Sequence, residues 1–110
     1  MKKVKLITPF EKDGQKIEVI ELNLSKLKGS DLVQVEQQMR IQGDLSPDPL
    51  FSSGGLATIA ARVSVPGLLP DDIKELSAPD FLTVTNTVKN FLYGWALPES
   101  MRSETSENQS

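Results

Sequence analysis

Residues 3–24 contain two strand-like runs joined by a short polar turn, and this pattern limits the fold more than any other feature of the chain. Residues 3–10 form the first run and residues 16–24 the second. Between them stands Asp13-Gly14, a pair typical of tight hairpin turns because glycine adopts positive φ without strain. Pro9 has no backbone N–H, so the first strand should end there or lie at a sheet edge. A lone hairpin is marginal in water, so helices must cover one face or a second chain must extend the sheet.

The rest of the chain predicts helices. In the first of them, Leu32, Val35 and Met39 form a narrow apolar stripe, and Gly43 is a stop signal. The pattern as a whole predicts an α+β fold, with an N-terminal β-hairpin followed by a small bundle of three to four helices. The helices are expected at residues 30–41, about 55–63, 70–76 and 77–94.

The final helix has the strongest start signal. Ser77 is placed to cap it, and Asp80 stands three residues later, where it can complete a weak capping box. Its apolar residues recur at helical spacing, so one face is apolar. Such a helix either closes the core or docks a partner. The apolar face comprises Phe81, Val84, Val88 and Phe91, with Leu92 beside them.

Two segments do not carry a regular pattern. Residues 44–55 are rich in Pro, Ser and Gly and are expected to form a flexible, partly folded loop. Residues 98–110 have almost no apolar content, which predicts a disordered polar tail. We therefore expect one small domain at residues 1–97 and a tail at 98–110.

The chain shows no catalytic apparatus. It contains no histidine and no cysteine, the usual general base and the usual thiolate ligand or nucleophile. Asp71, Asp72 and Glu75 gather at a helix start, where capping and the helix dipole explain them. Ser25 and Lys28 have a Ser-x-x-Lys spacing but no companion motifs, which favours a solvated link. We predict no enzyme, no cofactor and no catalytic or metal-binding residues.

Charge and hydropathy limit the classes of partner that the chain can bind. The net charge of −3 argues against nucleic acid, which needs a clustered basic surface. No apolar run approaches the length of a membrane span, so we expect a cytoplasmic protein without a membrane partner.

Aromatic residues near the end of the final helix are the best candidates for a contact surface. Phe81 and Phe91 match the buried face of that helix, whereas Tyr93 and Trp95 stand around Gly94 at its predicted end. Aromatic side chains are over-represented at binding hot spots. The candidate partner-binding residues are Phe91, Tyr93 and Trp95.

The order of these elements resembles that of a known family. The hairpin is followed by Leu-Lys-Gly-Ser-Asp-Leu at 27–32, a helix of small residues, Val-Pro with Leu-Pro-Asp-Asp-Ile-Lys-Glu-Leu within 65–76, and Ala-Pro-Asp-Phe-Leu-Thr-Val-Thr-Asn-Thr-Val-Lys-Asn-Phe-Leu at 78–92. Over about residues 3–92 the chain resembles the phage tail assembly chaperones of Mu-like contractile-tailed phages and their prophages.

The resemblance implies a non-enzymatic assembly factor in the cytoplasm of a bacterial host. It implies binding to the tape measure protein, which is kept soluble, and assistance in assembling the tail-tube protein around it. Whether the chain also forms a homo-oligomer is left open. The alternative is a small structural or adaptor subunit of a phage tail-like particle.

Overall fold

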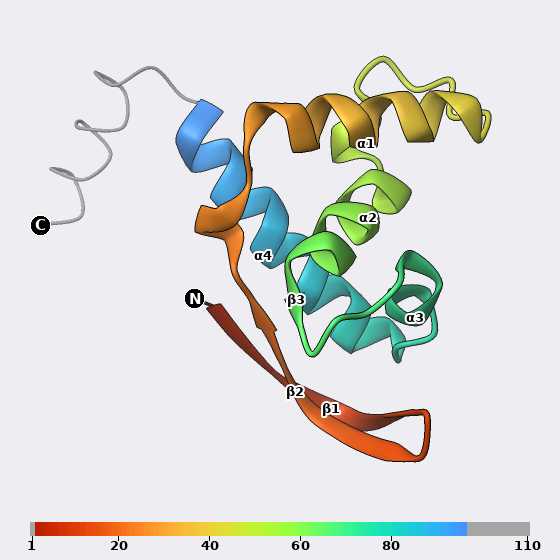
Figure 1. Cartoon of the computed structure of the whole chain (residues 1–110), viewed down its shortest axis with the longest axis vertical. Coiled ribbons are helices and arrows are strands. Elements are labelled where there is room, and N and C mark those ends of the chain that lie inside the picture. The colour runs from red at the N-terminus through yellow and green to blue at the C-terminus, as the bar shows by residue number, and fades with distance from the viewer. Residues whose placement is uncertain (1, 97–110) are drawn as a thin grey trace, which may run out of the picture.

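A computed structural model describes residues 2–96, excluding the side chains of residues 95 and 96. A hairpin precedes four α-helices, which confirms the predicted α+β class (Figure 1). In chain order the elements are β1 (Lys2–Lys12), β2 (Gln15–Leu22), the 3₁₀-helix η1 (Leu24–Lys26), α1 (Gly29–Ile41), the 3₁₀-helix η2 (Pro49–Phe51), α2 (Ser53–Val63), β3 (Ser64–Val65), α3 (Pro70–Lys74) and α4 (Ala78–Ala96).

The hairpin turn forms where Asp13-Gly14 predicts it. Asp13 has φ 52° and Gly14 φ 80°, so both central residues take the positive φ of the turn that suits twisted antiparallel strands. The pairing of β1 with β2 loses its regular register between Lys5 and Phe10. Strand β1 does not end at Pro9 but continues to Lys12. It lies at the edge of the sheet, which is the other position that Pro9 allows.

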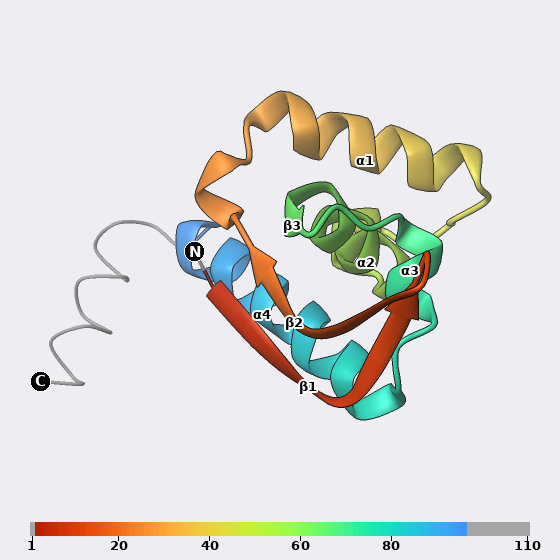
Figure 2. The same ribbon diagram turned by 60° about the horizontal axis from the view of Figure 1, so that its bottom comes forward.

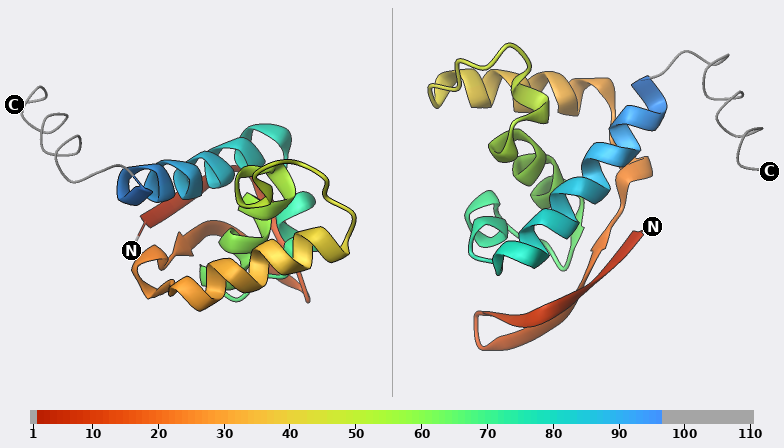
Figure 3. Two further views of the ribbon diagram at one scale, coloured as in Figure 1. Left: turned by 90° about the horizontal axis from the view of Figure 1, so that it is seen from above. Right: turned by 180° about the vertical axis from the view of Figure 1, so that it is seen from behind.

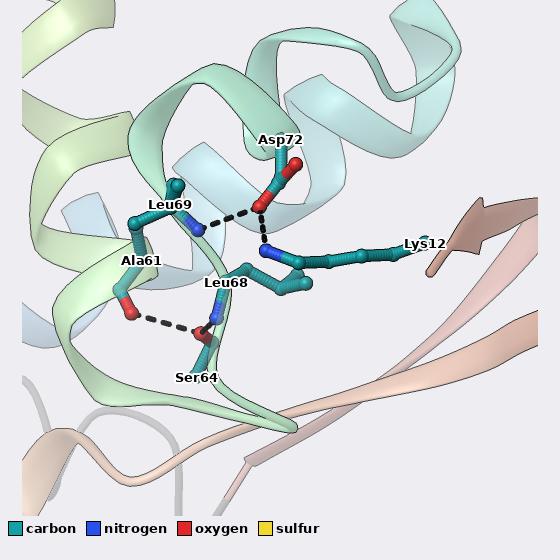
Figure 4. Close-up of polar contacts among 6 residues, drawn as sticks. All are labelled: Lys12, Ala61, Ser64, Leu68, Leu69 and Asp72. Atoms are coloured by element: carbon teal, nitrogen blue, oxygen red, sulfur yellow. Dashed lines mark hydrogen bonds and ion pairs between the residues drawn. The ribbon is translucent and has the colours of Figure 1, made fainter. Parts of the chain in front are cut away.

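A third strand was not predicted. Ser64 and Val65 pair with Leu22 and Glu21 to extend the sheet in the order β1-β2-β3. The Ser64 hydroxyl donates to the carbonyl oxygen of Ala61 at 2.8 Å and accepts from the Leu68 N–H at 2.9 Å (Figure 4). Two residues are too short to show an alternating pattern, so this strand depends on its tertiary partners.

Helix α2 lies at the centre of the helical layer, in contact with α1, α3, α4 and η2. Its small residues allow this close packing, and Ala57, Ala60 and Ala61 are all buried. Helix α4 packs against α2 on one side and β1 on another, as the views from above and behind show (Figure 3). Apolar side chains from the hairpin and from these helices form one core, with Ile20, Leu22, Ile59, Val84 and Val88 fully or almost fully buried.

The expectation of a flexible loop at residues 44–55 is wrong for its second half. Pro49 is buried within η2, and Ser52 caps α2, its hydroxyl accepting a hydrogen bond from the Gly55 N–H at 3.0 Å. Gly55 has no room for a side chain, because a Cβ there would stand 2.1 Å from the carbonyl oxygen of Pro49. Its glycine therefore permits a close approach of η2 to the first turn of α2.

The predicted end of the last helix is also wrong. Helix α4 continues through Tyr93 and Gly94 to Ala96. Gly94 does not take a positive φ, whereas Gly43, the predicted stop after α1, has φ 96°. A glycine ends a helix only when the chain turns at that position. The predicted tail at 98–110 lies outside the described residues, and the domain boundary at residue 97 stays a prediction.

Candidate functional site

The aromatic candidates lie on the last turns of α4 but not on one face. Phe91 is partly buried against the core, and Tyr93 is 55% exposed, with its ring in edge contact with Phe51 at 5.9 Å. Residues two apart on a helix are rotated by about 200°, so Phe91 and Tyr93 point to different sides. The side chain of Trp95 lies outside the described part of the chain.

Phe91 borders an open apolar groove of about 480 Å³. Its walls come from η1, the first turn of α1 and the last turns of α4, three segments that the views from behind and above show side by side (Figure 3). The apolar residues of this groove are Leu24, Leu27, Leu32, Phe91 and Leu92, and Ser25, Lys28 and Gly29 complete its lining. Hereafter this feature is the α1–α4 groove.

Sequence reasoning found only one wall of this groove. The sequence predicts a solvated link at residues 25–28, and Ser25, Lys26 and Lys28 are exposed. Leu27, however, is half-buried and lines the groove together with Leu32 and Phe91. The available signal was the apolar pair Leu24 and Leu27 inside a link of otherwise polar residues. That pair marks a segment that lies on an apolar surface.

Lys28 lines the α1–α4 groove, and further lysines line two depressions that share residues with it. On the far side of Phe91 a second depression is lined by Lys2, Lys3, Thr87 and Asn90. On the near side a third is lined by Lys26, Leu27, Lys28, Ser30, Asp31, Arg62 and Val63. The acid of this third depression, Asp31, is already engaged: its carboxylate accepts from Arg62 at 3.0 Å and from the Lys28 N–H at 2.8 Å. The backbone hydrogen bond from Lys28, followed by that from Arg62, lowers the pKa of Asp31.

Asp80 fixes the opposite end of α4. Its side chain is 1% exposed, and one carboxylate oxygen accepts from the Ile7 N–H at 2.8 Å. The other oxygen accepts from the Thr8 N–H at 3.0 Å and from the Ser77 hydroxyl at 2.9 Å. Both N–H groups belong to the stretch of β1 where the register is irregular. Asp80 therefore joins α4 to β1, a role that the predicted capping box did not include.

The charge state of Asp80 follows from these contacts. Burial alone would raise the pKa of its carboxyl group, but the hydrogen bonds from the two N–H groups and the Ser77 hydroxyl outweigh burial and hold the pKa below its ordinary value. The carboxylate is therefore ionised near neutral pH with its oxygens occupied. This arrangement suits a structural anchor, since a general acid or base needs an accessible oxygen.

The acidic cluster at the start of α3 also has structural partners. Asp72 accepts from the Leu69 N–H at 2.8 Å and forms an ion pair with Lys12 from the hairpin (Figure 4). The hydrogen bond from Lys12, followed by that from the Leu69 N–H, lowers the pKa of Asp72. Figure 2 shows the turn of the hairpin beside α3, where this ion pair joins them. The predicted capping role is confirmed for Asp72.

Within residues 2–96 no three acidic side chains converge into a group able to hold a metal ion. In the same part of the chain, no helix has both the length and the apolar content for crossing a membrane.

A comparison with models of known protein families gives a match that spans most of the chain. The model of the family described as "Phage tail assembly chaperone proteins, E, or 41 or 14" matches residues 3–93, which include every element from β1 to most of α4. No curated protein and no solved structure matches the chain.

Proposed function

Because the chain belongs to the family of phage tail assembly chaperones, we propose that it binds the tape measure protein of its own phage or prophage and keeps it soluble. In this proposal it acts without enzymatic chemistry in the cytoplasm of the bacterial host. The tail-tube protein, which replaces the chaperone during assembly, is the second proposed partner.

The α1–α4 groove is the observation that supports this function best. It is apolar and open, and the exposed Tyr93 lies on the same last turns of α4 but on another side of the helix. A long helical protein with apolar stripes aggregates unless those stripes are covered. Helix-in-groove packing is a common way to cover them. We propose Phe91, Tyr93 and Trp95 as contact residues, with Phe91 acting from inside the groove.

The size of the groove suits transient binding. An interface limited to five apolar residues and a polar edge is well below the area of obligate complexes. Several copies on one long partner raise the overall affinity through effective concentration, while each copy still dissociates readily. Weak single contacts therefore allow tail-tube subunits to replace the chaperone.

A second candidate is a small structural or adaptor subunit of a tail-like particle. Strand β1 favours it, because β1 lies at the edge of the sheet and pairs with β2 on one side. Such an edge can join sheets between subunits. Recovery of the protein in purified particles would support this candidate over a chaperone.

Co-expression tests the proposed function. The chain is expressed with the tape measure protein of the same phage or prophage, and the soluble fraction is analysed by pull-down and size-exclusion chromatography. The tape measure protein expressed alone is the control. A soluble, co-eluting complex together with an insoluble tape measure control supports the proposal and gives the stoichiometry. A failure to bind and to solubilise would overturn it.

A further inference from the structure

We propose that the α1–α4 groove receives an amphipathic helix whose apolar stripe is flanked by acidic side chains. This inference rests on the proposed function, and it adds the chemistry by which the groove selects its partner. It follows from the apolar lining, from the lysines in and beside it and from the secondary structure of its walls.

The walls of the groove favour a helix over an extended peptide. All eight lining residues belong to η1, α1, α4 or the link between η1 and α1, and none belongs to a strand. An extended peptide in the groove would therefore find no strand edge with which to pair its backbone. A helix satisfies its own backbone hydrogen bonds and presents only side chains. The apolar floor then takes residues spaced three or four positions apart.

The charges around the groove favour acidic flanks. Lys26 and Lys28 are exposed and form no salt bridge with a carboxylate of the described residues. The same is true of Lys2 beyond Phe91, while Lys3 contacts Glu21 at 3.6 Å. The acid at this end, Asp31, is held by Arg62. Lys28 does lie near the Asp31 carboxylate, but its electrostatic interaction with Asp31 is weaker than that of Arg62.

The lysines in and beside the groove contrast with the whole protein, whose net charge is −3. Charge complementarity chooses between partners and speeds their encounter, while apolar contact supplies most of the affinity. An apolar helix with acidic flanks therefore satisfies both features of the groove. A helix with basic flanks would place like charges beside Lys26 and Lys28.

Two designed peptides test this inference on the full-length chain. Both are amphipathic helices of about 20 residues with the same leucine stripe, a length that covers about five turns. One carries glutamates beside the stripe and the other carries lysines. Binding is measured by fluorescence anisotropy, and the contact surface is mapped by NMR shifts of the backbone amides of Leu27, Gly29 and Leu32.

A charge-reversal pair supplies the matched control. Lys26→Glu/Lys28→Glu alters two exposed side chains, one lining the groove and one in the adjoining depression. Lys16→Glu/Lys74→Glu makes the same change in charge on exposed side chains near the hairpin turn and at the end of α3. Circular dichroism checks that both variants fold.

We expect the acidic peptide to bind wild type at least about tenfold more tightly than the basic peptide, a difference that complementary charges readily produce. The groove variant should lose most of this preference, and the control variant should keep it. Equal binding of the two peptides, or an unchanged preference in the groove variant, would overturn the inference. Shift changes confined to β1 would do the same.

Two further outcomes separate competing explanations. Neutralising Glu99, Glu104 and Glu107 to Gln in the full chain should leave peptide affinity unchanged. A marked gain would show that the chain's own acidic segment occupies the groove, which would overturn the inference. In the co-expression test with the tape measure protein, a wild-type chain that does not bind refutes the proposed function. Equal binding by wild type and Lys26→Glu/Lys28→Glu refutes only the present inference.

Discussion

The two ends of helix α4 are packed in different ways. At its start, Asp80 is almost completely buried and its carboxylate accepts hydrogen bonds from the backbone of β1. At its other end, Phe91 borders an open apolar groove and Tyr93 is half exposed. A helix that must leave apolar surface open at one end loses packing there. Firm attachment at the other end keeps the open surface in a fixed position, which in the proposed function lowers the entropic cost of binding.

Loss of the anchor should give the largest effect. Asp80→Ala removes an almost fully buried carboxylate that accepts hydrogen bonds from the N–H groups of Ile7 and Thr8. We expect it to lower the free energy of unfolding by about 3 kcal/mol, since a hydrogen bond to a charged group contributes about 1.5–3 kcal/mol. Urea denaturation followed by circular dichroism measures the change.

Asp71→Ala is the control for that experiment. Asp71 also stands in the first turn of a helix, but its side chain is 94% exposed. We expect its replacement to cost at most about 0.5 kcal/mol through the helix dipole. Similar losses in the two variants would show that Asp80 acts only as a local helix residue, and the contrast between the ends of α4 would then fail.

Gly55→Ala should have the next largest effect, on the support behind Tyr93. The added Cβ would meet the carbonyl oxygens of Pro49 and Leu50 in η2, which carries the Phe51 ring that contacts Tyr93. Because both contacts are backbone atoms, η2 must move. We expect a loss of about 1–3 kcal/mol from overpacking, measured by thermal or urea denaturation, together with a change in Tyr93 fluorescence or NMR shift.

Gly94→Ala is the matched change at the open end. Apart from the neighbouring backbone of its own helix, no atom of the described residues lies within 4 Å of a Cβ built on Gly94, and this residue is helical. Alanine should be neutral or stabilise by up to about 1 kcal/mol, because it has the higher helix propensity. A loss from Gly94→Ala as large as that from Gly55→Ala would show that the end of α4 is packed rather than open.

The sequence predicts those parts of the fold that depend on neighbouring residues. Asp13-Gly14 places the hairpin turn, and apolar spacing places the helices, because both signals act over a few positions. Three features depend instead on contacts with distant segments: the ordered second half of the 44–55 segment, the end of α4 and strand β3. Ser52-Ser53-Gly54-Gly55 has the composition of a linker, yet η2 packs against it so closely that glycine is required at position 55.

The candidate site also contains some residues that local spacing predicts and others that only the fold brings together. Phe91 was found because helical spacing places it beside the apolar face of α4. Leu27 and Leu32 belong to the opposite wall, and only the fold brings them to Phe91. The Asp80 anchor has no local signal beyond the capping box, since its partner Ile7 is 73 positions away. One sequence without an alignment contains no information on that pairing.

Acid should weaken the attachment of α4 and of the hairpin through Asp80 and Asp72. The pKa values of Asp80 and Asp72 lie below the ordinary value of 3.8, so the unfolded chain binds more protons than the folded one as the pH falls. Their stabilisation is fully present above that value and is lost as the pH falls through the lowered values. We expect a stability plateau at neutral pH and a decline below about pH 4. Urea denaturation across this range measures it.

Salt and substitution separate the two carboxylates in the acid experiment. Salt screens the partly exposed pair of Asp72 with Lys12 but hardly affects hydrogen bonds to a buried carboxylate. Asp80→Asn should begin less stable and lose less on acidification. If this variant loses as much as wild type does, the acid sensitivity arises elsewhere and Asp80 is not the titrating anchor.

The smallest effect is expected at the ion pair between the hairpin and α3. Lys12→Met keeps the aliphatic stem and removes the charge that faces Asp72. We expect the free energy of unfolding, measured by urea denaturation, to fall by about 0.5 kcal/mol, the range of partly exposed ion pairs, because Asp72 retains the N–H of Leu69.

Lys16→Met is the control for this prediction. The side chain of Lys16 is 61% exposed, and its replacement should change nothing measurable. Affinity for the acidic peptide should also stay constant in Lys12→Met, because the substitution touches neither the α1–α4 groove nor Asp80. A drop in that affinity would show that the hairpin turn, which Lys12 joins to α3, is coupled to the groove. The contrast between an anchored end and an open end of α4 would then fail.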